Sequence, residues 1–299
     1  MIAAIVNPSA GSGSARRRWP HLLRQLNTRL GPINVHFTEA PGHATSLARD
    51  ITKQGCSLLI VAGGDGTLNE VVNGIPLGPQ SPRLGILPLA SGGDFARMLG
   101  VSRRQAAVAA ICREESTLID LFRARFVCQA GERKERLFVN AASFGLGAMV
   151  AERARRLPRL VPGKARYLAA TIPVLASSPH FLISMTVDGH QLSPLDITIA
   201  SIANGQFLGG GIRMAPRAAL DDGLADITVI NRVGLAELVR HLPILYSGAV
   251  YSHPKVKHWR VAKVVVTSED EVPVELDGEP VGKLPLEVDV IPAAIRIAR

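Results

Sequence analysis

Aromatic side chains and cysteines are scarce in this chain of 299 residues. Aromatic residues make up only 4% of it, which leaves few rings on which bases could stack, and no familiar nucleic-acid-binding motif occurs. The three cysteines, Cys56, Cys112 and Cys128, are widely spaced and odd in number, which favours reduced thiols over a disulfide framework or a zinc cage. These shortages argue against nucleic acid as a partner and favour a cytoplasmic protein.

Long apolar runs are also missing. No run approaches the roughly 18 residues that a membrane span needs. The opening segment IAAIVNP is too short, and too soon broken by Asn7 and Pro8, to be a signal peptide. Positive charge, by contrast, is in excess: the formal net charge of +9 favours an anionic partner such as a nucleotide or a lipid surface. A basic surface can also serve solubility alone.

Strands and helices alternate in the first third of the chain. Short apolar runs predict strands there, and apolar residues at helical spacing predict helices. This alternation predicts a parallel sheet with helices on both faces. The predicted strands are 2–6, 33–37, 57–62 and 84–88, and the predicted helices are 15–30, 45–53 and 103–113.

After about residue 118 short apolar runs crowd together between Gly, Pro, Asn and Asp, which predicts an antiparallel sandwich or barrel. We therefore expect an α/β domain over 1–118 and a β-rich domain over 119–299, with the last strand as a candidate to return to the first domain. The default site is the cleft between them. The predicted strands are 118–127, 136–142, 181–187, 196–203, 225–230, 261–267, 272–276 and 284–290, and the predicted helices are 148–157, 164–176 and 235–247.

Three glycine-rich turns follow predicted strands of the first domain: NPSAGSG at 7–13, GGDGT at 63–67 and ASGGD at 90–94. Glycine lets backbone amides approach an anion closely, and a helix N-terminus adds partial positive charge. Each turn alone could be only a turn, but three at one edge of a parallel sheet favour a phosphate site. Neither a Walker A sequence nor a dinucleotide-binding GxGxxG motif is present.

The motifs GGDGTLNEVVNG, LPLASGGDFARMLG and VNAASFGLGA resemble the diacylglycerol kinase catalytic family, and more narrowly its soluble bacterial lipid kinases, which are relatives of sphingosine kinases. GGDGT is shared with NAD kinases and, more loosely, phosphofructokinases, so it specifies only the superfamily. NGQFLGGGIRMAPRAALDDGLADI and LDGEP narrow the resemblance, which covers nearly the whole chain. It implies an NAD kinase-like or phosphofructokinase-like nucleotide-binding domain followed by a sandwich-like domain for the lipid substrate and the catalytic base.

The resemblance implies an ATP site in the first domain. The turn at 63–69 would wrap the phosphates, with Asp65 near the metal-phosphate centre. The implied ATP-binding residues are Asn7, Gly11, Gly13, Thr38, Gly63, Gly64, Asp65, Gly66, Thr67, Leu68, Asn69, Ser91 and Asp94.

The resemblance also implies a general base and a magnesium site. Glu279 would accept the proton of a lipid hydroxyl, with Asp277 as a supporting carboxylate or alternative base. Mg²⁺, which prefers oxygen ligands, would be held by the Asp222 side chain and the carbonyls of Ala219 and Leu224. Asp120 is a further candidate near the site. Asp-Gly is also a strong hairpin signal, so LDGEP could be merely a turn.

The chain departs from the family pattern at 90–94, where Gly-Thr-x-Asn-Asp is replaced by Ala-Ser-Gly-Gly-Asp. Ser91 keeps a hydroxyl, but Gly93 removes an amide side chain and Ala90 restricts a backbone position that glycine leaves free. The change predicts altered nucleotide affinity or substrate choice, and it leaves open a protein without efficient turnover.

The segment ERARRLPRLVPGKARY at 152–167 interleaves six basic residues with apolar ones. It is either a solvated helix face or a surface that docks on an anionic membrane, where each basic residue adds roughly 1 kcal/mol. We favour docking, hence peripheral membrane association.

These features predict an ATP- and Mg²⁺-dependent lipid kinase that converts diacylglycerol to phosphatidic acid. The alternatives are an NAD kinase-like enzyme and a nucleotide- or membrane-binding protein without turnover. The sequence leaves open whether the protein is a monomer or a homodimer.

Overall fold

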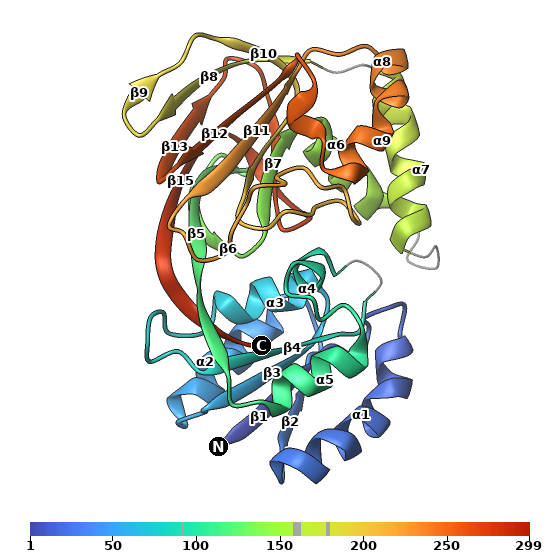
Figure 1. Ribbon diagram of the computed structural model, residues 1–299, viewed down its shortest axis with the longest axis vertical. Coiled ribbons are helices and arrows are strands. Elements are labelled where there is room, and N and C mark those ends of the chain that lie inside the picture. Colours follow the sequence, from blue (N-terminus) through green and yellow to red (C-terminus); the bar gives the residue numbers. More distant parts are fainter. Residues whose placement is uncertain (91–92, 158–162, 178–179) are drawn as a thin grey trace. The chain divides into compact units, whose positions relative to one another are not determined.

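The computed structural model describes residues 1–90, 93–157, 163–177 and 180–299. It divides into two compact units (Figure 1). The first comprises Met1–Leu121 and Pro292–Arg299, and the second comprises Phe122–Ile291. The C-terminal residues thus belong to the first unit. No helix in the described part of the chain is both long and apolar enough to cross a membrane.

The first unit is built on a parallel sheet. The strand order is the end of β15, then β4, β3, β1 and β2, and Arg296 at the end of β15 pairs with Arg83 of β4. All six residues of β3 are buried, as expected for a strand covered on both faces. The strands are β1 (Ile2–Val6), β2 (Asn34–Phe37), β3 (Leu58–Gly63), β4 (Arg83–Pro88) and β15 (Glu279–Ala298).

Helices cover both faces of this sheet, with α1 packed beside α5 and α2 beside α3 (Figure 1). The buried residues of α1 recur at helical spacing, as its sequence predicts: Ala15, Trp19, Leu22 and Leu26. The helices of this unit are α1 (Ser14–Leu30), α2 (His43–Lys53), α3 (Asp65–Val72), α4 (Asp94–Met98) and α5 (Arg104–Cys112).

The second unit is antiparallel. Six of its strands are hydrogen-bonded in a closed circuit, in the order β10, β7, β14, β15, β13 and β8. Alternate residues of these strands fill the core that the circuit encloses. Its largest buried side chains include Phe144, together with Phe122 and Phe138 from two further strands. The strands are β5 (Ser116–Cys128), β6 (Arg133–Phe138), β7 (Ala141–Gly145), β8 (Phe181–Val187), β9 (His190–Gln191), β10 (Leu195–Ala203), β11 (Ala225–Asn231), β12 (Val256–Val261), β13 (Lys263–Thr267) and β14 (Pro273–Leu276).

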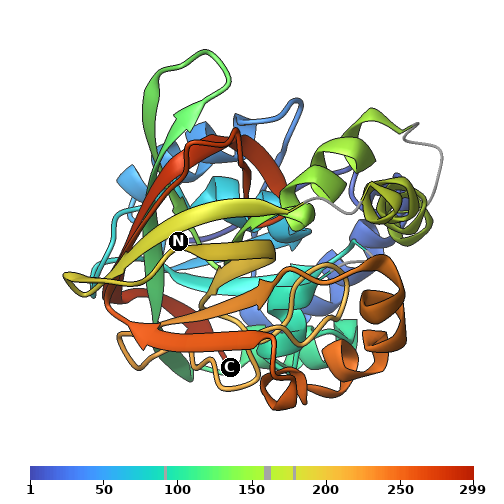
Figure 2. The ribbon, with the colours of Figure 1, turned by 90° about the horizontal axis from the view of Figure 1, so that it is seen from above.

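The helices of the second unit gather on one side of it, where α7 and the α8–α9 pair lie next to each other in two views (Figures 1 and 2). Leu238 of α8 packs against the cluster that contains Ala170 and Val174 of α7. These helices are α6 (Leu146–Arg156), α7 (Gly163–Ala176), α8 (Leu235–Arg240) and α9 (Leu242–Ser247), followed by the 3₁₀ turn η1 (Val250–Ser252).

The predicted fold class, a parallel α/β part followed by a β-rich part, is confirmed. Three predicted elements are each two elements in the structure. The predicted strand 136–142 divides into β6 and β7, and 261–267 spans the end of β12 and all of β13. The predicted helix 235–247 divides into α8 and α9, because Pro243 has no N–H to donate and lies in the first turn of α9.

Candidate functional site

The GGDGT segment lies where β3 ends and α3 begins, as the change of sequence period predicts. Its glycines are required by close packing. A Cβ on Gly63 would lie 2.5 Å from Thr67 Oγ1, and a Cβ on Gly64 would lie 2.9 Å from the Cβ of Ala90. A larger residue at Gly63 would therefore displace Thr67 in the first turn of α3, and one at Gly64 would push the turns after β3 and β4 apart.

Asp65 and Asp94 start short helices after neighbouring parallel strands, and the structure brings them together. The backbone N–H of Asp94 donates to Oδ2 of Asp65 at 3.1 Å. Arg97 in turn donates to Oδ1 of the buried Asp94 at 2.5 Å. Two carboxylates and one guanidinium are thus linked at the carboxyl edge of the sheet, where open α/β sheets bind their ligands.

The turn after β1 reaches the same edge. Asn7 Nδ2 donates to Thr67 Oγ1 at 3.1 Å, which ties this turn to α3. Gly11 has a φ of 60°, and a Cβ there would lie 2.4 Å from the carbonyl oxygen of Leu89, so its backbone passes directly against the end of β4. Gly13, with a φ of 81°, leads into α1.

The remaining residues of the predicted nucleotide site differ in position and in burial. Thr38 follows β2, and its N–H donates to the carbonyl of Val6 at 2.9 Å, so it lies beside the end of β1. Leu68 and Asn69 are buried in the unit, and the N–H of Leu68 donates to the carbonyl of Gly64 at 3.1 Å, so both residues serve the packing of α3 in this structure. Gly66 lies in the first turn of α3, and Ser91 falls outside the described residues.

Sequence reasoning missed Arg97, whose place three residues after Asp94 on a short helix was the available signal. It also assigned Asp120 to the neighbourhood of the site. In the structure Asp120 is buried, and its Oδ1 accepts the N–H of Ala293 at 2.8 Å. Ala293 has a φ of 48°, so this contact supports an unusual backbone turn in β15 and gives Asp120 a structural role.

In the second unit Asp277 and Gly278 form a two-residue hairpin turn between β14 and β15. Their φ values are 49° and 83°, as a type I′ turn requires, and Leu276 pairs with Glu279. The Asp277 carboxylate accepts N–H groups from Val139, Asn140 and Ala141 at 2.9, 2.9 and 3.1 Å. Val139 and Asn140 connect β6 to β7, and Ala141 begins β7, so Asp277 fastens the hairpin to this junction.

Asp277→Asn should therefore lower stability more than it changes chemistry. An amide offers one acceptor oxygen in place of two, and the lost charge-assisted bonds should cost about 2–4 kcal/mol. Asp188→Asn is a matched control, because Asp188 sits before Gly189 at a φ of 45° and accepts the N–H groups of Ala262 and Lys263. Denaturant unfolding should show a loss of stability for both variants. A drop in kcat for Asp277→Asn at unchanged stability would contradict a purely structural role.

Glu279 begins β15 with a side chain that is 38% exposed. Its Oε2 accepts from Arg136 Nη2 at 2.8 Å, so a cation from β6 orients this carboxylate. Of the two carboxylates that the resemblance brings forward as bases, Glu279 is the one whose side chain is accessible and not committed to backbone amides of the fold. Arg136 was not predicted, because the pair is separated by 143 residues.

At the predicted magnesium site, the Asp222 side chain is ion-paired with an arginine of the chain itself. Asp222 Oδ1 accepts the N–H of Leu224 at 3.0 Å, and Arg260 forms an ion pair with Oδ2. Arg260 also lies 3.3 Å from the carboxylate of the buried Asp226, whose pKa is raised by burial and lowered by this guanidinium. Both oxygens of Asp222 are therefore engaged in this structure, and Mg²⁺ held by Ala219, Asp222 and Leu224 stays a prediction.

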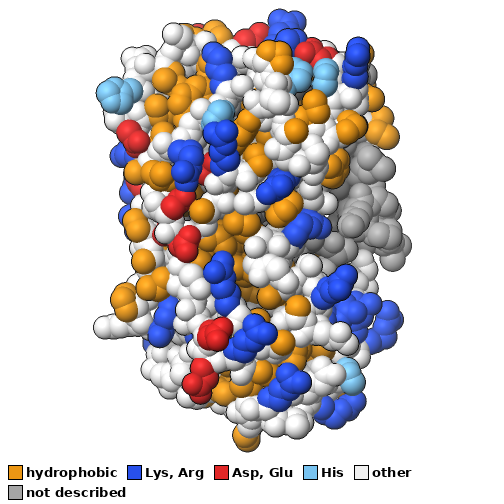
Figure 3. Space-filling model, viewed as in Figure 1, with side chains coloured by type: hydrophobic (Ala, Val, Ile, Leu, Met, Phe, Trp, Pro, Cys, Tyr) orange, Lys and Arg blue, Asp and Glu red, His pale blue; other side chains and the backbone are white. Residues whose placement is uncertain are grey.

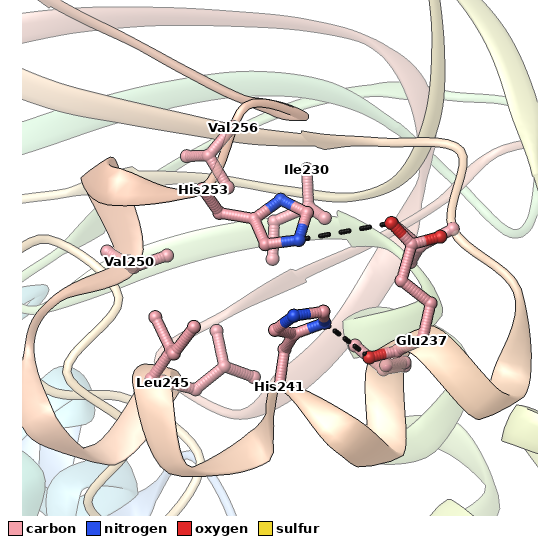
Figure 4. Close-up of a pocket in the computed structure, with 10 residues that line it drawn as sticks. Ile230, Glu237, His241, Leu245, Val250, His253 and Val256 are labelled. Atoms are coloured by element: carbon pink, nitrogen blue, oxygen red, sulfur yellow. Dashed lines mark hydrogen bonds and ion pairs between the residues drawn. The ribbon is translucent and has the colours of Figure 1, made fainter.

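Within the described residues no group of three or more His, Cys, Asp or Glu side chains is placed to hold a metal ion. His241, His253 and Glu237 lie beside one another at one pocket of the second unit (Figure 4). The two histidine rings are 4.6 Å apart, and Glu237 lies 3.9 Å from His253 and 2.7 Å from Lys255. The apolar cavity beside them has a volume of about 30 Å³, which is room for one water molecule. It holds no lipid chain without movement of α8 and α9.

Two family models match the chain. The diacylglycerol kinase catalytic domain matches residues 1–124, and the YegS C-terminal NAD kinase beta sandwich-like domain matches residues 140–299. Together they cover both parts that the sequence motifs indicate.

Individual relatives agree with these matches. A diacylglycerol kinase from Staphylococcus haemolyticus is 31% identical over 283 residues, which span 94% of this chain and 82% of that protein. A crystal structure from Bacillus anthracis strain Sterne, assigned as a diacylglycerol kinase, is 25% identical, with a TM-score of 0.81 over 99% of this chain and 94% of that one.

A more distant likeness concerns the fold alone. Yeast NADH kinase in complex with NADH is 12% identical, with a TM-score of 0.52 over 99% of this chain and 82% of that one. The matches to both halves of the chain and the 31% identity to a relative over most of its length confirm the resemblance seen in the motifs, and the chain belongs to the diacylglycerol kinase family.

Proposed function

We propose that this protein transfers the γ-phosphate of ATP, supplied as its magnesium complex, to the hydroxyl of diacylglycerol and so forms phosphatidic acid. The observation that carries the proposal is the meeting of the turns after β1, β3 and β4 at one sheet edge, with Asp65 hydrogen-bonded to Asp94. Family membership supports the lipid as acceptor.

In this proposal the first unit binds the nucleotide. Backbone N–H groups of the glycine-rich turns contact the phosphates, and the N-terminus of α3 adds partial positive charge. Asp65 lies beside the Mg²⁺ that accompanies the phosphates. Arg97, already near this edge, adds a cation to offset charge on the transferred group.

In the second unit Glu279 accepts the proton of the lipid hydroxyl as the oxygen–phosphorus bond forms. Its exposed carboxylate is held by Arg136, which limits the orientations that it samples. Phosphoryl transfer depends mainly on positioning and charge neutralisation, so one oriented base and one phosphate cradle suffice for the chemistry.

Radiolabelled ATP incubated with the protein and dispersed diacylglycerol tests this proposal. We expect label in phosphatidic acid and no label in NAD offered in the same buffer. Label in NAD instead would establish the NAD kinase alternative. Nucleotide binding without transfer to diacylglycerol, NAD or a total lipid extract would establish a binding protein without turnover.

We also propose that the helical side of the second unit contacts the membrane that supplies the lipid. Its helices expose large apolar side chains: Ile172 of α7, Val239 of α8, and Leu242 and Tyr246 of α9. Arg153, Arg155 and Arg156 are exposed in the last turn of α6, which packs against α7. The remainder of the predicted basic segment includes residues 158–162, which lie outside the described residues.

Replacing Arg153, Arg155 and Arg156 together by glutamine should weaken binding to vesicles that contain phosphatidylglycerol by about tenfold or more, since each basic residue adds roughly 1 kcal/mol. Binding of the unchanged protein should fall steeply with salt, because exposed charges are screened over about 10 Å at 0.1 M. Cosedimentation measures both effects.

Arg16, Arg17 and Arg18 on the exposed side of α1 provide a control with the same change of charge. Lys and Arg side chains are spread over the face seen in Figure 3 rather than gathered in one patch. Attraction of the whole protein's net positive charge to the vesicles is therefore an alternative to a localised docking surface. Equal loss of vesicle binding in both triple variants would contradict a localised docking surface.

A further inference from the structure

Arg136 of β6 belongs to the face of its strand that carries core residues. In the pairing of β5 with β6, Phe138 lies opposite Phe122 and Arg136 lies opposite Ala124. Side chains alternate between the two faces of a strand, so Arg136 projects from the same face as the buried Phe138. Along this face the apolar side chains are followed by a guanidinium.

The neighbouring arginines project from the opposite face and find their carboxylates there. Arg125 lies opposite Glu135, and their charged groups are 3.1 Å apart. Arg123 Nε lies 3.3 Å from the same carboxylate. Arg136 instead contacts Glu279 at the start of β15, at 2.8 Å between Nη2 and Oε2, and the two side chains are 25% and 38% exposed. The proposed base thus has a cation within reach of solvent beside it.

The proposed transfer changes the charge on one member of this pair. The lipid oxygen gives its proton to Glu279 and bonds to the γ-phosphorus, and the bond from that phosphorus to the bridging oxygen of ADP breaks. Glu279 becomes neutral, Arg136 keeps its charge, and ADP leaves with its magnesium. The pair therefore passes from a net charge of zero to one positive charge while an anionic phosphate monoester forms.

The geometry of general-base catalysis puts this phosphate next to the pair. A base lies about 2.6–3.2 Å from the oxygen whose proton it takes. The phosphorus bonds to that same oxygen, so the phosphate oxygens are the next atoms beyond it. A guanidinium carries five N–H donors in a planar fork that fits phosphate oxygens, and the bond to Glu279 uses one of these donors.

We propose that Arg136 is a catalytic residue: its guanidinium holds Oε2 of Glu279 before the transfer and contacts the phosphate formed on the lipid as Oε1 takes the proton. This role rests on the proposed function, in which Glu279 is the base. A contact that strengthens as Glu279 loses its charge is stronger in the transition state than in the ground state, and such contacts raise kcat.

Binding of dioctanoyl-phosphatidic acid, a short-chain form of the product, tests the phosphate contact without turnover. The measurement is made by calorimetry in the Glu279→Gln protein, where the base carries no charge that Arg136 could serve. Adding Arg136→Gln should weaken this binding about ten- to a hundredfold, the usual worth of a hydrogen bond to a charged group. Binding of dioctanoylglycerol, which has no phosphate, should stay the same.

Arg123→Gln in the same Glu279→Gln protein is the matched control. It makes the same change of charge on the adjacent strand, but on the opposite face. It should leave the affinity for dioctanoyl-phosphatidic acid unchanged. Equal losses for Arg123→Gln and Arg136→Gln would mean that only net charge matters, and no loss for Arg136→Gln would mean that Arg136 serves Glu279 alone. Either result would overturn the phosphate contact.

Turnover gives a second measurement. With Glu279 in place, Arg136→Gln should lower kcat and kcat/KM for diacylglycerol by the same factor of about 10²–10³, as expected when one donor to developing charge is removed. Arg136→Lys keeps the charge without the planar fork and should lower kcat about tenfold. Should Arg136→Gln fail to fold, full activity of Arg136→Lys would by itself overturn the proposal.

Failure of this role and failure of the proposed function give different results. Transfer of label to diacylglycerol by the unchanged protein, together with equal affinities of Glu279→Gln and its Arg136→Gln derivative for dioctanoyl-phosphatidic acid, would reject the phosphate contact alone. Absence of transfer to diacylglycerol by the unchanged protein would reject the proposed function, and the catalytic role of Arg136 with it.

Discussion

Asp65→Asn should reduce phosphoryl transfer by about 10³-fold or more while the protein stays folded, since a charged group at the transferred phosphate is typically worth 10²–10³-fold or more. The asparagine carbonyl oxygen can still accept the N–H of Asp94, so the turns after β3 and β4 should remain joined. What is lost, in the proposed mechanism, is the negative charge beside the magnesium and phosphates. The turnover number and the melting temperature should both be measured on the same preparation of each variant.

Asp50→Asn supplies the control, because Asp50 is an exposed residue of α2 in the same unit and the chemical change is the same. It should leave both turnover and melting temperature unchanged. Near-normal turnover by a folded Asp65→Asn protein would remove Asp65 from the metal-phosphate centre. Equal loss in both variants would point to a general effect of charge.

Glu279→Gln should lower kcat by about 10²–10⁴-fold, the usual contribution of a general base. Affinity for ATP should change little, since the glycine-rich turns belong to the other unit. Glutamine can still accept from Arg136, so the start of β15 should keep its position. The alternative that LDGEP is only a hairpin turn predicts that this substitution is nearly silent.

Glu287→Gln is the matched control for this substitution. Glu287 lies on the same strand and is also ion-paired, with Arg125 at 3.1 Å and Lys263 at 2.6 Å. Its replacement should leave kcat unchanged. Full activity of Glu279→Gln would exclude Glu279 as base, and a loss confined to Asp277→Asn at full stability would move that role to Asp277.

Features that depend on near neighbours in the chain could be predicted from the sequence. The apolar run before GGDGT and the helical spacing after it locate β3 and α3, because each period reports local backbone geometry. Asp277-Gly278 predicts a hairpin for the same reason, and the structure contains it. The division of 136–142 into β6 and β7 was missed, because the amides of that connection bond to Asp277, far along the chain.

Partners of the candidate residues could not be predicted, because they come from distant segments. Arg136 and Glu279 are 143 residues apart, and Val139 and Asp277 are 138 apart. The ion pair between Asp222 and Arg260 could not be predicted either. Arg260 lies on β12, a largely exposed strand, and nothing in the nearby sequence indicates that it pairs with Asp222. Sequence motifs named the acidic residues, and only the fold supplied the side chains that orient or neutralise them.

The pairing of β15 with β4 has a consequence for the order in which the protein is made. The nucleotide-binding sheet begins with residue 2, yet the strand that pairs with the far side of β4 is supplied by residues near 296. Until the residues near 296 have left the ribosome, one edge of β4 offers unpaired N–H and C=O groups, which are a template for association with other chains. Synthesis at about 5–20 residues per second leaves that edge open for some ten seconds or longer after residue 88 emerges. A nonsense mutation before codon 296 would leave it open permanently.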